Sequence, residues 1–195
     1  MKKSSIAPVV EMSFDDQITE ESGTKSAIQT MLRATSTSQI KLSEMADTKA
    51  NILISVNSII ISLILTIMLP SLQEESYYTI PTLIFLSATV STIIVAIIAI
   101  RPNLNRGTFR IKDIEEKKTN LLFFGNFHRM SLQHYESAMR MMMKDPDYLY
   151  RSMLKDTYYL GLVLAKKYRR VRLAYNIFMA GLIVSIIAFT IASFR

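Results

Sequence analysis

The chain has 195 residues, half of them hydrophobic, with 23 Lys and Arg against 16 Asp and Glu and no cysteine. Without cysteine it can hold no disulfide, iron–sulfur cluster or thiolate metal site. The formal net charge of +7 is concentrated in residues 101–173, which hold 16 Lys and Arg against 7 Asp and Glu. This distribution indicates membrane topology, and it argues against a nucleic acid polymer as partner.

Three apolar runs contain no charged residue: 50–69, 82–100 and 174–194. Each is about 20 residues long, the length with which an α-helix crosses the bilayer core. The sequence therefore predicts three transmembrane helices and the lipid bilayer as a partner.

The charges beside these runs predict their orientation, because Lys and Arg are retained on the cytoplasmic side of short loops. The loop 71–81 holds Glu74 and Glu75 and neither Lys nor Arg, so it faces out, and residues 101–173 face in. The N-terminus is then cytoplasmic, and the C-terminus at Arg195 is periplasmic.

Helix-breaking Pro and Gly residues and changes in polarity divide the rest of the chain into segments. Residues 1–24 are polar and read as a disordered cytoplasmic tail. No Pro or Gly occurs from 25 to 69, so one helix should run from the cytosol into the membrane. The ordered membrane module is expected to occupy 25–195.

The cytoplasmic region 101–173 predicts further helices. A Met-rich helix is expected from about Ser131 to Lys144, after a charged segment at 111–119. Asp145 and Pro146 form a good helix start, from which a second long helix should reach Phe194. The fold class is all-α: a membrane protein with three transmembrane helices, a small cytoplasmic helical bundle, and two long helices that continue from the cytosol into the bilayer.

Polar residues form a stripe along the first apolar run. Their spacing of three or four places them on one helix face, where polar groups in hydrocarbon meet other helices or water. Two interpretations are open: a helix packing seam, or the lining of a pore. The polar stripe consists of Asp47, Asn51, Ser55, Ser58, Ser62 and Thr66.

Small residues form a face on the last apolar run. They allow close approach of helix backbones, either within one chain or between chains. Such packing faces favour a homo-oligomer of undefined order. The face comprises Ala174, Gly181, Ser185, Ala188 and Ala192.

An aromatic segment and a basic cluster are candidates for nucleotide binding. Aromatic rings stack on bases, amides read base edges, and cationic groups bind phosphate. The alternative is that the aromatic residues form the bundle core and the cations anchor the chain at lipid headgroups. The candidates are Asn120, Phe123, Phe124, Asn126, Phe127 and His128 with Lys166, Lys167, Arg169 and Arg170.

Signatures of catalysis are missing from the sequence. His128 and His134 lie about 120° apart on a helix, and no carboxylate stands at ligand spacing beside them. There is no Walker loop and no nucleophile elbow. We predict no enzymatic activity, no catalytic residue, no cofactor and no metal site.

Four motifs resemble the Pycsar effector transmembrane family, over about residues 25–194. They occur in the family's order, and together they are more specific than any short pattern. The motifs are IKLSEMADTKANIL at 40–53, NLLFFGNFH at 120–128, MMKD with DYLY at 142–150, and AYNIF at 174–178.

This resemblance implies an antiphage defence effector of the bacterial inner membrane. A partner pyrimidine nucleotide cyclase would supply the activating ligand, cyclic CMP or cyclic UMP. The effector would then impair the inner membrane and cause abortive infection. Two alternatives stay open: an effector that answers cyclic oligonucleotides, and a membrane anchor or scaffold that takes no part in signalling.

Overall fold

The computed structural model describes residues 14–68, 76–102, 120–123, 127 and 130–194. This part of the chain is helical and contains no strand, which confirms the all-α class. Its elements are α1 (Phe14–Leu63), a π-helical turn (Ile64–Met68), a 3-10 turn (Ser76–Tyr78), α3 (Thr79–Ile100), α6 (Leu132–Met143) and α7 (Pro146–Ser193).

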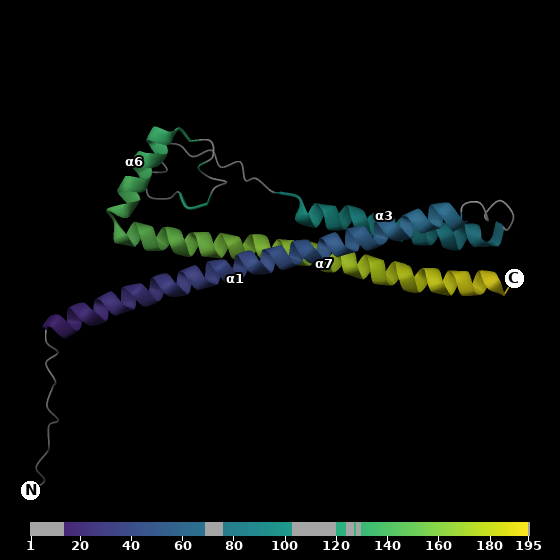
Figure 1. Cartoon of the computed structure of the whole chain (residues 1–195), viewed down its shortest axis with the longest axis horizontal. Coiled ribbons are helices and arrows are strands. Elements are labelled where there is room, and N and C mark those ends of the chain that lie inside the picture. The colour runs from purple at the N-terminus through teal and green to yellow at the C-terminus, as the bar shows by residue number, and fades with distance from the viewer. Residues whose placement is uncertain (1–13, 69–75, 103–119, 124–126, 128–129, 195) are drawn as a thin grey trace, which may run out of the picture.

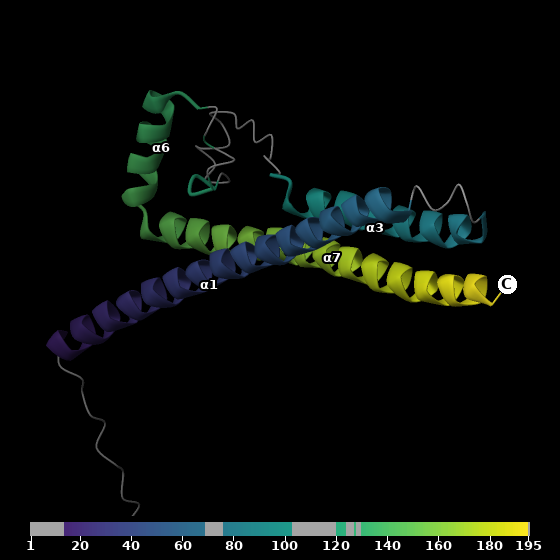
Figure 2. The same cartoon turned by 45° about the vertical axis from the view of Figure 1, so that its right-hand side comes forward.

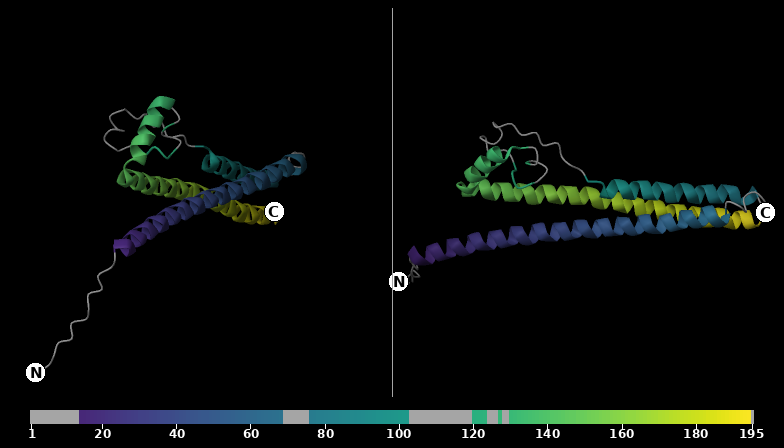
Figure 3. Two further views of the ribbon diagram at one scale, coloured as in Figure 1. Left: turned by 60° about the vertical axis from the view of Figure 1, so that its left-hand side comes forward. Right: turned by 45° about the horizontal axis from the view of Figure 1, so that its top comes forward.

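The two long helices α1 and α7 cross, and α3 packs beside both of them (Figure 1). The end of α1, the start of α3 and the end of α7 lie together at one end of the molecule, and α6 stands at a steep angle to the start of α7 (Figure 2). Figure 3 shows that α1 and α7 diverge toward the α6 end. We call residues 23–46 of α1 and 146–173 of α7 the polar arms, and residues 47–63 of α1, 174–193 of α7 and the whole of α3 the membrane bundle.

The predicted starts of α6 and α7 are confirmed. The backbone N–H of His134 donates to the Ser131 hydroxyl at 3.4 Å, and that of Tyr148 donates to Asp145 Oδ1 at 3.1 Å. Each side chain thereby satisfies an N–H that the first helical turn leaves without a partner. Pro146 follows at the first helical position, where its missing N–H costs nothing.

The helix α1 begins at Phe14, about ten residues before the predicted start. Gly23, which suggested a boundary, lies inside this helix, with no other group within 4 Å of the position its Cβ would take. A glycine lowers helix stability by only about 1 kcal/mol relative to alanine, which one long helix can absorb. Residues 1–13 of the predicted tail, 71–75 of the predicted loop and the charged segment 111–119 lie outside the described residues.

Among the described residues, three helices are long and apolar enough to cross a membrane, as predicted: α1 with its π-helical turn, α3 and α7. Large aliphatic side chains cover the outside of the bundle; Ile59, Ile80 and Ile187 are 62%, 70% and 55% exposed. The inside holds small residues instead. This arrangement is the reverse of a water-soluble core and suits a surface that faces lipid.

Candidate functional site

An alanine-rich seam joins α1, α3 and α7 at the base of the polar arms. All its members are buried, and five of the seven are alanines, so the helix backbones come close together. The seam residues are Ala46, Ala50 and Leu53 of α1, Ala96 and Ala99 of α3, and Val171 and Ala174 of α7.

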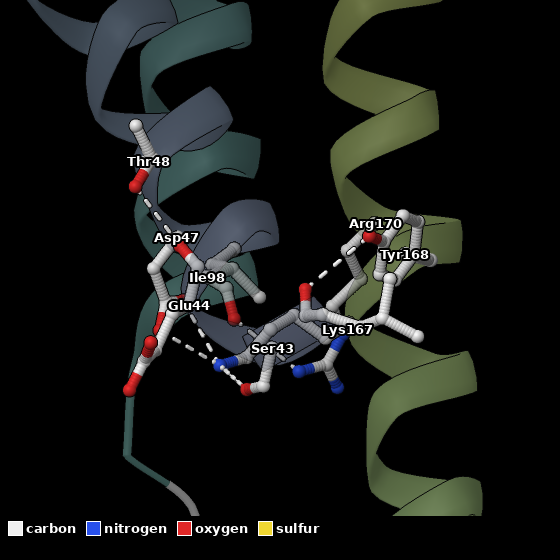
Figure 4. A network of polar contacts seen from close by, with 9 residues as sticks. Ser43, Glu44, Asp47, Thr48, Ile98, Lys167, Tyr168 and Arg170 are labelled. Atoms are coloured by element: carbon white, nitrogen blue, oxygen red, sulfur yellow. Dashed lines mark hydrogen bonds and ion pairs between the residues drawn. The ribbon is translucent and has the colours of Figure 1, made fainter. Parts of the chain in front are cut away.

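Beside the seam, an ion pair joins α1 to α7 (Figure 4). Lys167 Nζ lies 2.9 and 3.0 Å from the two carboxylate oxygens of Asp47, and it donates to Ser43 Oγ at 2.7 Å. The Tyr168 hydroxyl donates to the carbonyl of Leu42 at 3.2 Å, and Arg170 Nη1 donates to the carbonyl of Ile98 in α3 at 3.2 Å. Through these contacts α7 is bonded to both α1 and α3 beside the seam.

We expect Lys167→Ala to lower the stability of the folded chain by about 1–2 kcal/mol, because it leaves the Asp47 carboxylate without its cation. The Lys167 side chain is only 17% exposed, whereas Asp47 at 39% is partly screened by water. Thermal unfolding followed by circular dichroism measures the effect. Lys166→Ala is the matched control, since Lys166 is exposed. An equal loss of stability in the two variants would contradict this role.

The polar stripe lies largely on the outside of the single chain. Asp47 is half-buried against α7, but Asn51, Ser55, Ser58, Ser62 and Thr66 are exposed. The hydroxyls of Ser58 and Thr66 donate to the carbonyls of Ile54 and Ser62 at 2.8 Å. For the Asn51 and Ser55 side chains, no partner is found among the described residues. Packing within one chain therefore does not account for this stripe.

A second polar set lies inside the membrane bundle, and sequence reasoning missed it. Asn57 is fully buried; its amide donates to the Leu53 carbonyl at 2.8 Å, while no described group donates to its Oδ1. It extends the alanine-rich seam by one helical turn, and that spacing from Ala46, Ala50 and Leu53 was a signal that could have revealed it. The other buried members are Thr82, Thr89 and Thr92 of α3 and Ser185 of α7.

The small-residue face of α7 packs within the chain. Ala174 and Ser185 are buried, and the Cβ that Gly181 lacks would lie 2.2 Å from the Cβ of Ala88 in α3. Gly181 thus allows the two backbones to approach where no side chain fits.

The aromatic segment contributes to packing around α6 and α7. Leu121 is buried with Ala138 of α6, and the rings of Phe127 and Tyr135 lie 4.8 Å apart. Asn120 is buried, and its side-chain oxygen Oδ1 accepts a hydrogen bond from the backbone N–H of Leu122 at 3.0 Å. Phe124, Asn126 and His128 lie outside the described residues.

The basic cluster lies farther along α7 than the point where Asn120 contacts this helix. Asn120 reaches Asp156, which precedes Lys166 by ten residues, or about 15 Å of helix. Two of the cations, Lys167 and Arg170, serve the contacts with α1 and α3 described above. Lys166 and Arg169 are exposed. Among the described residues, the aromatic segment and the basic cluster do not form one pocket.

A cavity of about 370 Å³ opens instead between the polar arms. From α1 it is lined by Gln29, Leu32, Arg33 and Ser36. From the opposite side it is lined by Leu122 and by Met153, Asp156 and Thr157 of α7. The hydroxyls of Ser36 and Thr157 lie 3.4 Å apart and link the two arms at its edge.

The pKa of Asp156 in this cavity is raised above its usual value of 3.8, because burial disfavours the charged carboxylate. A hydrogen bond from Asn120 Nδ2 to Asp156 Oδ1, 3.2 Å long, opposes part of this rise. The carboxyl is thus held in place by Asn120, while its burial favours the protonated form more than exposure to water would.

A pH dependence follows from this shift. A carboxyl whose pKa is higher in the folded than in the unfolded chain binds more protons when folded, so its contribution to stability falls as the pH rises above 3.8 through the folded pKa. Asp156→Asn keeps the acceptor for Asn120 and carries no charge. We expect this variant to gain stability over the original chain at pH 7 and to lose that advantage toward pH 4. Melting temperatures measured across this range would contradict the prediction if their difference stayed constant.

These features define the class of protein. It is an integral membrane protein with three candidate spanning helices, two of which continue beyond the membrane as polar arms that hold a cavity between them. A family model described as the Pycsar effector protein domain matches residues 30–193, so the chain belongs to the Pycsar effector family. This confirms the resemblance found in the motifs, and the family is not a known family of enzymes. No curated protein and no solved structure matches the chain.

Proposed function

We propose that this chain is an antiphage effector that responds to a cyclic pyrimidine nucleotide, cyclic CMP or cyclic UMP, and then impairs the integrity of the inner membrane. A partner pyrimidine nucleotide cyclase makes the messenger during infection, and membrane failure ends the infected cell. The observation that carries this proposal is the match of the Pycsar effector domain to residues 30–193.

The charge distribution supports a cytoplasmic location for the polar arms. Residues 101–173 carry most of the surplus Lys and Arg, the pattern of segments retained in the cytoplasm. In this orientation the N-terminus is cytoplasmic and the C-terminus periplasmic. Both arms then lie in the compartment where a cyclase would release its product.

The exposed polar stripe supports assembly of several copies in the membrane. Polar side chains that face hydrocarbon are costly unless they meet another helix or water. On a single chain the exposed side chains of Asn51 and Ser55 have no hydrogen-bond partner among the described residues, and a second copy can supply one. An oligomer would bring several stripes together, and a rearrangement of that oligomer would let water and ions pass between them.

The messenger can shift this equilibrium only by binding the conducting state more tightly than the resting state. A change from about 1% to about 99% conducting requires about 5.5 kcal/mol of differential binding. The ion pair and the seam at the base of the arms favour the resting arrangement.

Liposome leakage tests this function. The purified full-length chain is reconstituted into dye-loaded liposomes, and cyclic UMP, cyclic CMP, cyclic AMP and a cyclic dinucleotide are added one at a time. We expect leakage with one pyrimidine messenger and none with the others. Protein-free liposomes are the control.

Two results would overturn the proposal. Leakage caused by the cyclic dinucleotide alone would identify an effector for cyclic oligonucleotides. A reconstituted and folded chain that releases no dye with any messenger would favour a membrane anchor.

A further inference from the structure

The cavity between the polar arms is large enough to hold a small ligand. Its volume of about 370 Å³ falls within the range of about 300–1,000 Å³ that is typical of small-molecule sites. It lies where α1 and α7 begin to diverge, next to the Ser36 and Thr157 contact. A ligand there would contact both long helices at once.

The cavity is lined by a cationic, an acidic and several apolar side chains. Arg33 is exposed at its edge and forms no ion pair with any described residue, so its guanidinium is available to an anion. Asp156 is half-buried on the opposite arm, and its carboxylate accepts hydrogen bonds. Leu32, Leu122 and Met153 supply apolar surface between these groups.

This combination limits the ligand. A bare inorganic anion would gain from Arg33 but would be repelled by the Asp156 carboxylate. A ligand that suits both has an anionic group at one end and a hydrogen-bond donor on a flat, partly apolar body at the other. A pyrimidine mononucleotide meets these requirements, with its phosphate at one end and the cytosine amino group or the uracil N3–H at the other.

We propose that this cavity is the binding site for the cyclic pyrimidine mononucleotide, with Arg33 paired to the phosphate and Asp156 accepting a hydrogen bond from the base. Asn120 is a positioning residue, because its amide holds Asp156 Oδ1 at 3.2 Å. The assignment rests on the proposed function for the identity of the messenger. It names a site that differs from the basic cluster.

The contacts of the basic cluster support this choice. Lys167 already neutralises Asp47, and Arg170 already binds the Ile98 carbonyl. Recruiting either cation to a phosphate would break an interaction between helices. Arg33 requires no such exchange within the described structure.

Isothermal titration of the full-length chain in detergent tests the assignment, with cyclic CMP, cyclic UMP, cyclic AMP and inorganic phosphate as the four probes. Arg33→Gln removes the cation proposed to pair with the phosphate, at an exposed position. Asp156→Asn keeps one oxygen to accept the hydrogen bond from Asn120, and it replaces the other oxygen, which is proposed to accept from the base, with an amide that donates. We expect each variant to weaken binding of the pyrimidine messenger by about tenfold or more. Circular dichroism confirms that each variant is folded.

Two matched controls change cations outside the cavity. The first control is Lys41→Gln, about two helical turns after Arg33 on α1. The second is the double variant Lys166→Gln with Arg169→Gln in the basic cluster. All three positions are exposed. We expect both control proteins to bind like the original chain.

The possible outcomes distinguish failure of the proposed binding site from failure of the proposed function. Binding that is lost in the cluster variant but kept in Arg33→Gln and Asp156→Asn would overturn the cavity as the site and leave the proposed function intact. Inorganic phosphate that binds as tightly as the nucleotide would overturn the role of Asp156 in reading the base. An original chain that binds neither cyclic CMP nor cyclic UMP would overturn both proposals.

Discussion

Replacing Asn51, Ser55 and Ser58 together by leucine is expected to abolish dye release and cell killing while leaving the fold and messenger binding intact. These side chains are exposed on the single chain, so leucine at these positions disturbs no packing within it. Leucine would remove the polar surface that a water path between copies needs. Leakage from liposomes and survival of expressing cells measure the effect.

The control is the triple replacement of Ile52, Val56 and Ile59 by leucine. These residues lie on the same span and are 54%, 41% and 62% exposed, but they are already apolar. We expect full activity from this protein. If the stripe variant still kills, the stripe does not conduct, and the buried set around Asn57 becomes the candidate path.

The second large effect, on the stability of the folded chain, is expected from a substitution at Gly181. In Gly181→Ala the new Cβ would lie 2.2 Å from the Cβ of Ala88, far inside the usual contact distance of about 3.5–4.0 Å. Neither atom belongs to a flexible side chain, so α3 and α7 must move apart. We expect a loss of about 2–3 kcal/mol and a melting temperature lower by about 5–10 °C, measured by circular dichroism in detergent.

The matched control is Gly161→Ala on the same helix. Here the nearest group is the flexible amide end of Gln39, 3.4 Å from the new Cβ, so the substitution gains helix propensity without a severe clash. Adding Ala88→Gly to Gly181→Ala should restore part of the lost stability. If the two single glycine variants melt alike, close packing at Gly181 does not hold the bundle together.

Most of the fold could be predicted from the sequence because its signals are local. Uncharged runs mark the spans. Ser131 and Asp145 mark the starts of α6 and α7 by accepting a hydrogen bond from the residue three positions later, and Pro146 occupies the first position of α7. Such signals require no knowledge of which helices become neighbours.

The choice of buried face was not predictable in this way. Three of the four residues in the buried set Ala46, Ala50, Leu53 and Asn57 stand one position before a residue of the polar stripe, or about 100° of helix away. Small residues and polar residues are both found where membrane helices meet, so the sequence offers two credible contact faces on one helix. Only the packing of α3 and α7 distinguishes them.

The cavity was also beyond sequence reasoning. Arg33 and Asp156 belong to different long helices and are 123 positions apart, and no spacing rule connects them. Asn120 was selected for its amide, but its partner Asp156 becomes evident only when the segment folds against α7.

The crossing of α1 and α7 makes α1 a lever with unequal lengths on either side of the Asp47 contact. Arg33 precedes Asp47 by 14 residues and Thr66 follows it by 19, or about 21 Å and 28 Å of helix. If α1 pivots there as a stiff rod, its membrane end travels about a third farther than the cavity end and delivers correspondingly less force. The movement of the membrane end then depends more on the force with which a bound ligand separates the arms than on the distance by which the arms separate.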